Sequence, residues 1–113
     1  MLGLSMAHRQ EQCFELAFTA IRDPHHENDV LVHGTVITPR RVRRGVIERR
    51  RTVHAWIIIH GDVVYDPVLD RLFKRDHYYK AFAATEVRRY SATEATRAAS
   101  TSGNKGPWHD GSD

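Results

Sequence analysis

The sequence predicts a small α+β domain, and three patterns carry that prediction. Apolar residues recur at helical spacing in 11–21, the segments 30–38 and 53–59 are rich in β-branched residues, and a Ser91-to-Glu94 helix start follows them. A chain of 113 residues with 41% hydrophobic content can bury one modest core but not two. We therefore expect an N-terminal buried helix packed on a small antiparallel β-meander, with further helices at the C-terminal end.

The segment 11–21 has the pattern of a central helix. Most of its circumference is apolar, with one stripe formed by Cys13, Leu16, Ala17 and Ala20 and an adjacent stripe formed by Phe14, Phe18 and Ile21. Pro24 follows closely, and the residue before a proline is pushed out of helical geometry. Cys13 therefore falls in the first turn, where the positive end of the helix dipole stabilises a thiolate.

The middle of the chain predicts three antiparallel strands. The first, 30–38, contains Gly34 as a β-bulge or a point of close backbone approach, and Pro39 is expected to end it. The second becomes strongly apolar at 53–59, where apolar residues on both parities indicate a central strand that is covered on both faces. After a glycine-containing turn, 63–65 forms the third strand of the meander.

The C-terminal part predicts a helix at 70–84, a short strand at 86–90 and a second helix at 92–100 that begins with a capping box. We place a single domain at residues 1–100 and expect 101–113 to be a mostly flexible tail, because it is rich in Gly, Ser and Asn. Pro107 and Trp108 are the residues that could fix this tail to the body.

Composition argues against membrane and secreted proteins. No segment approaches the roughly 18 to 20 consecutive apolar residues of a membrane span, and the apolar run at 1–6 is too short for a secretory signal. A lone cysteine forms no internal disulfide, and its thiol is expected to stay reduced. We expect a soluble, cytoplasmic protein.

The positive charge is concentrated in one segment. Seven of the arginines lie in 40–51, between two predicted strands, which suggests the end of a β-hairpin. Nucleic acid or an acidic protein could bind there. The alternative is a solvated strand edge whose charge prevents pairing with other chains, and the absence of aromatic residues in 40–51 favours that alternative over single-strand binding.

Metal and cofactor sites are not predicted. His25, His26 and Glu27 are adjacent, but neighbouring residues of one strand or helix do not easily share one ion. No His-x-x-x-His spacing occurs either. We therefore expect neither a metal nor a cofactor.

Three residues supply the parts of a thiol acyl-transfer site. A cysteine becomes nucleophilic when an imidazole and a helix N-terminus favour its thiolate, and the imidazole needs a carboxylate or amide to orient it. Cys13, His54 and Asp66 provide nucleophile, base and orienting group in that order. Taken alone, a cysteine in an apolar helix is more often a packing residue. The downstream histidine and aspartate favour the catalytic interpretation.

The order of these motifs resembles the transglutaminase-like group of the papain-like cysteine hydrolase fold. The similarity covers 12–67 and consists of Gln12-Cys13-Phe14, His54-Ala55-Trp56 and Tyr65-Asp66-Pro67. It implies that Cys13 attacks an amide or ester carbonyl, His54 carries the proton and Asp66 fixes the imidazole tautomer. The Cys13 backbone N–H and the Gln12 amide are the oxyanion donors that it suggests. Papain itself has its Gln six residues before the Cys, where this chain has Ala7, so the papain subfamily is disfavoured.

A register argument decides whether Asp66 can reach His54. Directly opposed side chains on paired strands share a face. A two-residue turn at 61–62 would set Asp66 opposite Ile57, on the wrong face. A three-residue loop at 60–62 would set it opposite Trp56 and within reach of His54. The triad hypothesis therefore requires a three-residue loop or a bulge.

The sequence thus predicts a cysteine hydrolase or acyltransferase, such as a peptidase, amidase or deamidase. Trp56, Arg43 and Arg44, with Gln12, are the predicted substrate-binding residues, and the substrate is a peptide or protein, acidic if the arginines select it. The alternative is a non-enzymatic module that uses the Arg40 to Arg51 hairpin to bind nucleic acid or an acidic protein.

Overall fold

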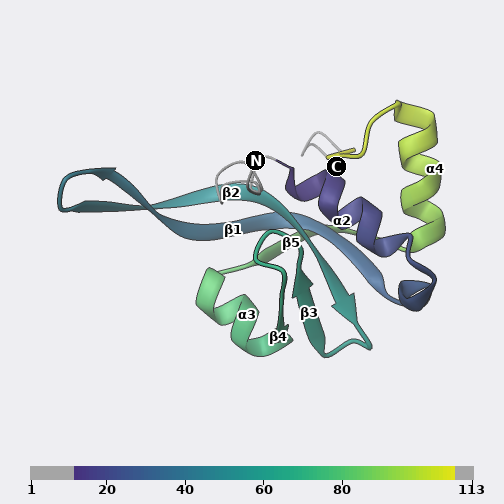
Figure 1. Cartoon of the computed structure of the whole chain (residues 1–113), viewed down its shortest axis with the longest axis horizontal. Helices are drawn as coiled ribbons and strands as arrows, with labels where there is room; N and C mark the ends of the chain where they lie inside the picture. The colour runs from purple at the N-terminus through teal and green to yellow at the C-terminus, as the bar shows by residue number, and fades with distance from the viewer. Residues whose placement is uncertain (1–11, 109–113) are drawn as a thin grey trace, which may run out of the picture.

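The computed structural model describes residues 12–108, with the backbone alone for 40–43. It has five strands, three α-helices and one short 3₁₀ helix (Figure 1). In chain order the elements are α2 (Cys13–Ile21), η1 (Pro24–His26), β1 (Val30–Arg43), β2 (Val46–Ile59), β3 (Val63–Asp66), β4 (Arg71–Lys74), α3 (Arg75–Phe82), β5 (Thr85–Tyr90) and α4 (Ala92–Ser102). The predicted α+β class is confirmed.

The strands form one antiparallel sheet in the order β4-β3-β2-β1-β5. The predicted meander is its central part, and β2 is the middle strand, as the two-sided apolar pattern of 53–59 indicates. Pro39 does not end β1, so that prediction was wrong. It lies opposite Arg49, beyond the part of β1 that pairs with β5, where a residue without an N–H is tolerated.

The predicted helix at 70–84 is wrong in its first third. Residues Arg71–Lys74 form β4, which pairs with β3, and α3 begins only at Arg75. The turn before β4 closes through a hydrogen bond of 2.7 Å from Asp70 N–H to the Asp66 carbonyl. This turn returns the chain alongside β3, and strand pairing then overrides the helical propensity of the segment.

Two apolar layers lie on opposite faces of the sheet. On one face, α2 and α4 pack on a cluster that includes Ala17, Ile21, Ala55, Ile57 and Ala95. On the other face, a cluster with α3 is formed by Val32, Val36, Trp56, Ile58, Val64 and Tyr78. None of the helices within residues 12–108 is long and apolar enough to cross a membrane.

Gly34 has the close backbone approach that its position suggested. A β-bulge between His33 and Gly34 interrupts the pairing of β1 with β5. A Cβ built on Gly34 would lie 2.1 Å from the backbone oxygen of Thr85 and 2.8 Å from the ring of Trp56. Only glycine fits there without moving β5 away from β1.

The C-terminal helix begins as predicted and ends later. Ser91 and Glu94 form a capping box, and α4 continues to Ser102, where Gly103 caps it in the left-handed conformation. The helix therefore extends past the predicted domain boundary at residue 100. Trp108 packs on the α2 layer, which confirms the predicted contact, and 109–113 lie outside the described residues.

The β1–β2 hairpin extends beyond the rest of the sheet as a two-stranded arm (Figure 1). The pairing with β5 involves only 31–35 of β1, and the pairing with β3 involves only 57–59 of β2. We call residues 36–53 the arm. Its two-residue turn is Arg44-Gly45, and Gly45 has a φ of +71°.

Candidate active site

The loop between β2 and β3 has the three residues that the triad hypothesis requires. Strand β2 ends at Ile59 and β3 begins at Val63, with Ile59 opposite Val63 and Ile57 opposite Tyr65. The next position along this register sets Asp66 against Trp56. Asp66 and His54 therefore share the face of the sheet that α3 covers, and the loop prediction is confirmed.

Asp66 is the centre of a buried hydrogen-bond network. Its Oδ2 accepts a bond of 2.9 Å from His54 Nε2 and one of 2.5 Å from the Tyr78 hydroxyl. Its Oδ1 accepts bonds of 2.9 and 3.1 Å from the N–H groups of Val68 and Leu69. The carboxylate is only 3% exposed, so these four donors replace the water that it loses on burial.

Cys13 is the first residue of α2 and is 2% exposed. Its side chain hydrogen-bonds to His54 and so contributes to the pKa of the imidazole. Because His54 Nε2 is bonded to Asp66, the hydrogen bond with the sulfur involves Nδ1. The structure therefore brings the three predicted residues together in the order thiol, imidazole, carboxylate.

The electrostatics of the network favour a charged imidazole. Burial lowers the pKa of His54, but hydrogen bonds and charge interactions with Asp66 and Cys13 outweigh it and raise the pKa to about 9. Burial raises the pKa of Asp66, yet the bond from His54 and those from Tyr78 and Leu69 hold it below its usual value. At neutral pH the pair is therefore an imidazolium and a carboxylate. The Cys13 side chain therefore lies beside a cation.

Tyr78 is the part of the site that sequence reasoning missed. The residue is 1% exposed and belongs to the apolar cluster that α3 forms with the sheet. Its hydroxyl nevertheless donates to Asp66, and burial together with the Asp66 charge raises its pKa, so it stays protonated. The turn before β4 redirects the chain so that α3 packs under His54. No motif in the sequence indicates that turn.

Replacing Tyr78 by phenylalanine should lower the free energy of unfolding by about 1 to 3 kcal/mol, because a buried carboxylate loses one of its donors. The loss should be present above about pH 4 and should shrink as the pH falls through the lowered pKa of Asp66. Urea unfolding at pH 7 and pH 3 measures both. Tyr65→Phe, which removes an exposed hydroxyl bond to Asp70, is the matched control. An equal loss in the two variants would contradict the assignment.

The substrate-binding role of Trp56 stays a prediction, and the structure places this residue inside the core. The side chain is 0% exposed, and its Nε1–H donates to the Tyr79 hydroxyl at 3.1 Å. The indole packs against the Tyr78 ring at 5.8 Å between centroids and lies 6.1 Å from the His54 ring. Trp56 therefore supports the imidazole from inside the core.

Of the other predicted substrate residues, Gln12 adjoins Cys13 and Arg44 lies far from the triad. Gln12 precedes α2 without capping it through its side chain, and it lines an open cleft of about 460 Å³ with Phe14 and Lys105. Its oxyanion role stays a prediction. Arg44 is exposed at the turn of the arm, ten positions from His54, which corresponds to about 33 Å along a strand. The side chain of Arg43 lies outside the described residues.

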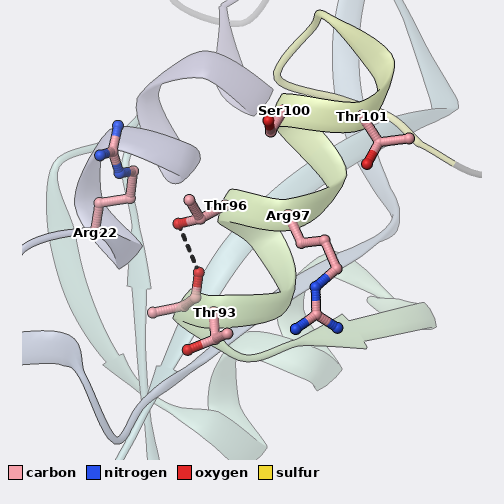
Figure 2. A pocket seen from close by; sticks show the side chains of 7 residues that line it. Arg22, Thr93, Thr96, Arg97, Ser100 and Thr101 are labelled. Atoms are coloured by element: carbon pink, nitrogen blue, oxygen red, sulfur yellow. Dashed lines mark hydrogen bonds between the residues drawn. The ribbon is translucent and has the colours of Figure 1, made fainter.

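Two further cavities differ in volume and in the residues that line them. A cavity of about 50 Å³ borders His54 and Asp66 together with Thr38 and Tyr78, and it is large enough for a water molecule but not for a substrate. An open cleft of about 530 Å³ lies between the end of α2 and α4 (Figure 2). Hydroxyl side chains line it, and Figure 2 shows Arg22 and Arg97 on opposite sides of them. It contains none of the predicted site residues.

Within residues 12–108, no group of three His, Cys, Asp or Glu side chains is arranged to hold a metal ion. His25 and His26 bond instead to Asp23 and Asp29, each at 2.8 Å.

Comparisons with known proteins found no matching family model, no matching curated protein and no matching solved structure.

Proposed function

We propose that this protein is a cysteine hydrolase or acyltransferase of transglutaminase-like type, acting on an amide or ester carbonyl. The observation that supports it most is the placement of one buried imidazole between two partners. His54 bonds to Asp66 through Nε2 and interacts with Cys13 on its other side. This is the geometry that a nucleophile, a proton carrier and an orienting carboxylate need.

The chemistry would proceed in two balanced steps. The Cys13 thiolate forms a C–S bond to the carbonyl carbon, while the His54 imidazolium gives its proton to the departing amine or alcohol as the C–N or C–O bond breaks. Water or an amine then attacks the thioester. Neutral His54 takes a proton from the attacking water or amine, the C–S bond breaks, and the thiolate–imidazolium pair forms again. The Cys13 backbone N–H, unpaired within α2 because it belongs to the first turn, is the nearest donor for the carbonyl oxyanion.

Burial sets a condition on this reaction. Cys13 is 2% exposed, and the cavity beside His54, of about 50 Å³, cannot hold an acyl group. Reaction therefore requires an opening at the first turn of α2 that admits the carbonyl. Hydrogen bonds to Val68, Leu69 and Tyr78 hold Asp66 in place independently of Cys13, so the imidazole stays oriented when the site opens.

Acylation by p-nitrophenyl acetate tests the proposal. We expect a burst of p-nitrophenol and one acetyl group on Cys13, detected by mass spectrometry of the intact protein and its peptides. His54→Gln should slow acylation by roughly 10²- to 10⁴-fold, the usual contribution of a positioned proton carrier. His60→Gln, at an exposed loop position, is the matched control and should leave the rate unchanged. Acetylation confined to lysines, or an equal rate in Cys13→Ala, would contradict the proposal.

A further inference from the structure

One face of the arm carries two arginine side chains flanked by two apolar ones, and all four are exposed. They are Ile47, Arg49, Arg51 and Val53, which we call the arm stripe. Ile47 is 64% and Val53 60% exposed, which is unusual for β-branched residues of a strand. Arg51 donates to Thr35 on the neighbouring strand at 2.8 Å, so its guanidinium lies across this same face.

The arm is also positively charged, whereas the rest of the protein is negatively charged. Residues 40–51 contain seven arginines and one glutamate, a net charge of +6, whereas the whole chain carries +3, so the remaining residues together carry −3. Neither Arg49 nor Arg51 forms an ion pair with a carboxylate in the described part of the chain. Both charges are therefore open to an external acid.

The arm stripe leads directly to the helix that carries Cys13. Val53 is followed on the same face by Ala55 and Ile57, which are fully buried in the layer formed with α2. In Figure 1 the first turn of α2, at the purple end of the chain, is the end of that helix nearest to the arm. A chain lying along the stripe would therefore meet the start of α2.

We propose that the arm stripe binds an extended, acidic segment of the protein substrate and directs it toward Cys13. The inference rests on the proposed acyl-transfer function. Arg49 and Arg51 are two positions apart on one strand face, about 7 Å, which matches acidic side chains at alternate positions of an extended peptide. The substrate class is thus a polypeptide with an acid-x-acid segment that has an apolar residue two positions before or after it, opposite Ile47 or Val53.

A peptide suits this surface better than a nucleic acid does. The two arginines are flanked by exposed Ile47 and Val53, which would bury apolar surface against side chains but not against phosphates. The sequence of the arm at 40–51 contains no aromatic residue on which bases could stack.

The test uses the full chain and two fluorescein-labelled peptides of identical composition. One has glutamates at alternate positions, with serine between them and valine two positions before and after them, and the other has the same glutamates in one block. We expect anisotropy to show tighter binding of the alternating peptide, and about tenfold or greater weakening by Arg49→Glu and by Arg51→Glu. Arg50→Glu, the same change on the opposite face of the same strand, is the matched control and should weaken binding less than threefold.

A second measurement links the stripe to the thiol. The alternating peptide ending in a vinyl sulfone should alkylate Cys13 faster than its block isomer. Equal losses in all three arginine variants, equal binding of both peptides, or tighter binding of a 20-base-pair DNA duplex would overturn the proposal in favour of a general polyanion surface. Binding of the alternating peptide without faster alkylation would also overturn it. Failure of the acyl-transfer proposal is seen separately, in acetylation by p-nitrophenyl acetate, which does not involve the arm.

Discussion

Replacing Asp66 by alanine should lower the free energy of unfolding at pH 6 by about 3 to 5 kcal/mol. The carboxylate accepts bonds from His54, Tyr78 and two backbone N–H groups, and all four donors would be left inside the protein without it. The substitution also removes the charge that keeps the buried His54 imidazole protonated. Few single changes in this chain would disturb as many buried polar groups.

The pH dependence of this loss follows from the two pKa shifts. The raised pKa of His54 stabilises the folded protein fully below about pH 6.5, and this contribution is lost as the pH rises through about 9. The lowered pKa of Asp66 stabilises it above about pH 4, and that contribution is lost as the pH falls. The difference between wild type and Asp66→Ala should therefore be largest at pH 4 to 6.5 and smaller at both extremes.

Urea unfolding between pH 3 and pH 10 measures this difference. Asp62→Ala is the control, because Asp62 is exposed in the neighbouring loop, and it should change stability by less than about 0.5 kcal/mol. If Asp66→Ala proved as mild as Asp62→Ala, or if its effect did not vary with pH, the buried ion pair would not exist as described.

The sequence was most informative where local chemistry and burial agree. Apolar residues on both parities identified β2 as the central strand, and the Ser91-to-Glu94 pattern identified the start of α4. Because side chains alternate between the two faces of a strand, the number of residues in the loop decides whether His54 and Asp66 lie on the same face. The loop has three residues, at 60–62, where His60 has a φ of +53° and Gly61 one of +76°.

Sequence reasoning was least informative where one residue organises distant parts. Asp66 bonds to the N–H groups of Val68 and Leu69 and so shapes the turn that makes β4 pair with β3. Local propensity favours a helix there, and the pairing is a tertiary effect. Because this turn also places Tyr78 against Asp66, the missed strand and the missed site residue have the same cause.

The structure separates the predicted substrate residues in space, and their roles stay predictions. Trp56 follows His54 in a motif, but residues two apart on a strand point to the same face, and here that face is closed by α3. The arginines form one cluster in the sequence. In the strand, side chains alternate between the two faces, so Arg49 and Arg51 lie on one face and Arg50 lies on the other. Arg44 falls at the far end of the arm.

The central claim is that His54, held by Asp66, lies beside Cys13 as a cation and makes it a nucleophile. Alkylation of Cys13 by iodoacetamide at pH 6 tests it, with His54→Gln as the variant that removes the imidazole. The imidazole is charged at this pH, because its pKa is raised to about 9. A cation beside a cysteine speeds its alkylation, since only a thiolate is nucleophilic.

We predict that Cys13 of the wild type is alkylated at pH 6 at least about tenfold faster than Cys13 of His54→Gln. Circular dichroism of the variant confirms that its thiol is measured in a folded protein, and His60→Gln should behave as the wild type. Equal rates in the wild type and in His54→Gln would mean that Cys13 is a buried packing thiol, and the proposed acyl-transfer function would be withdrawn.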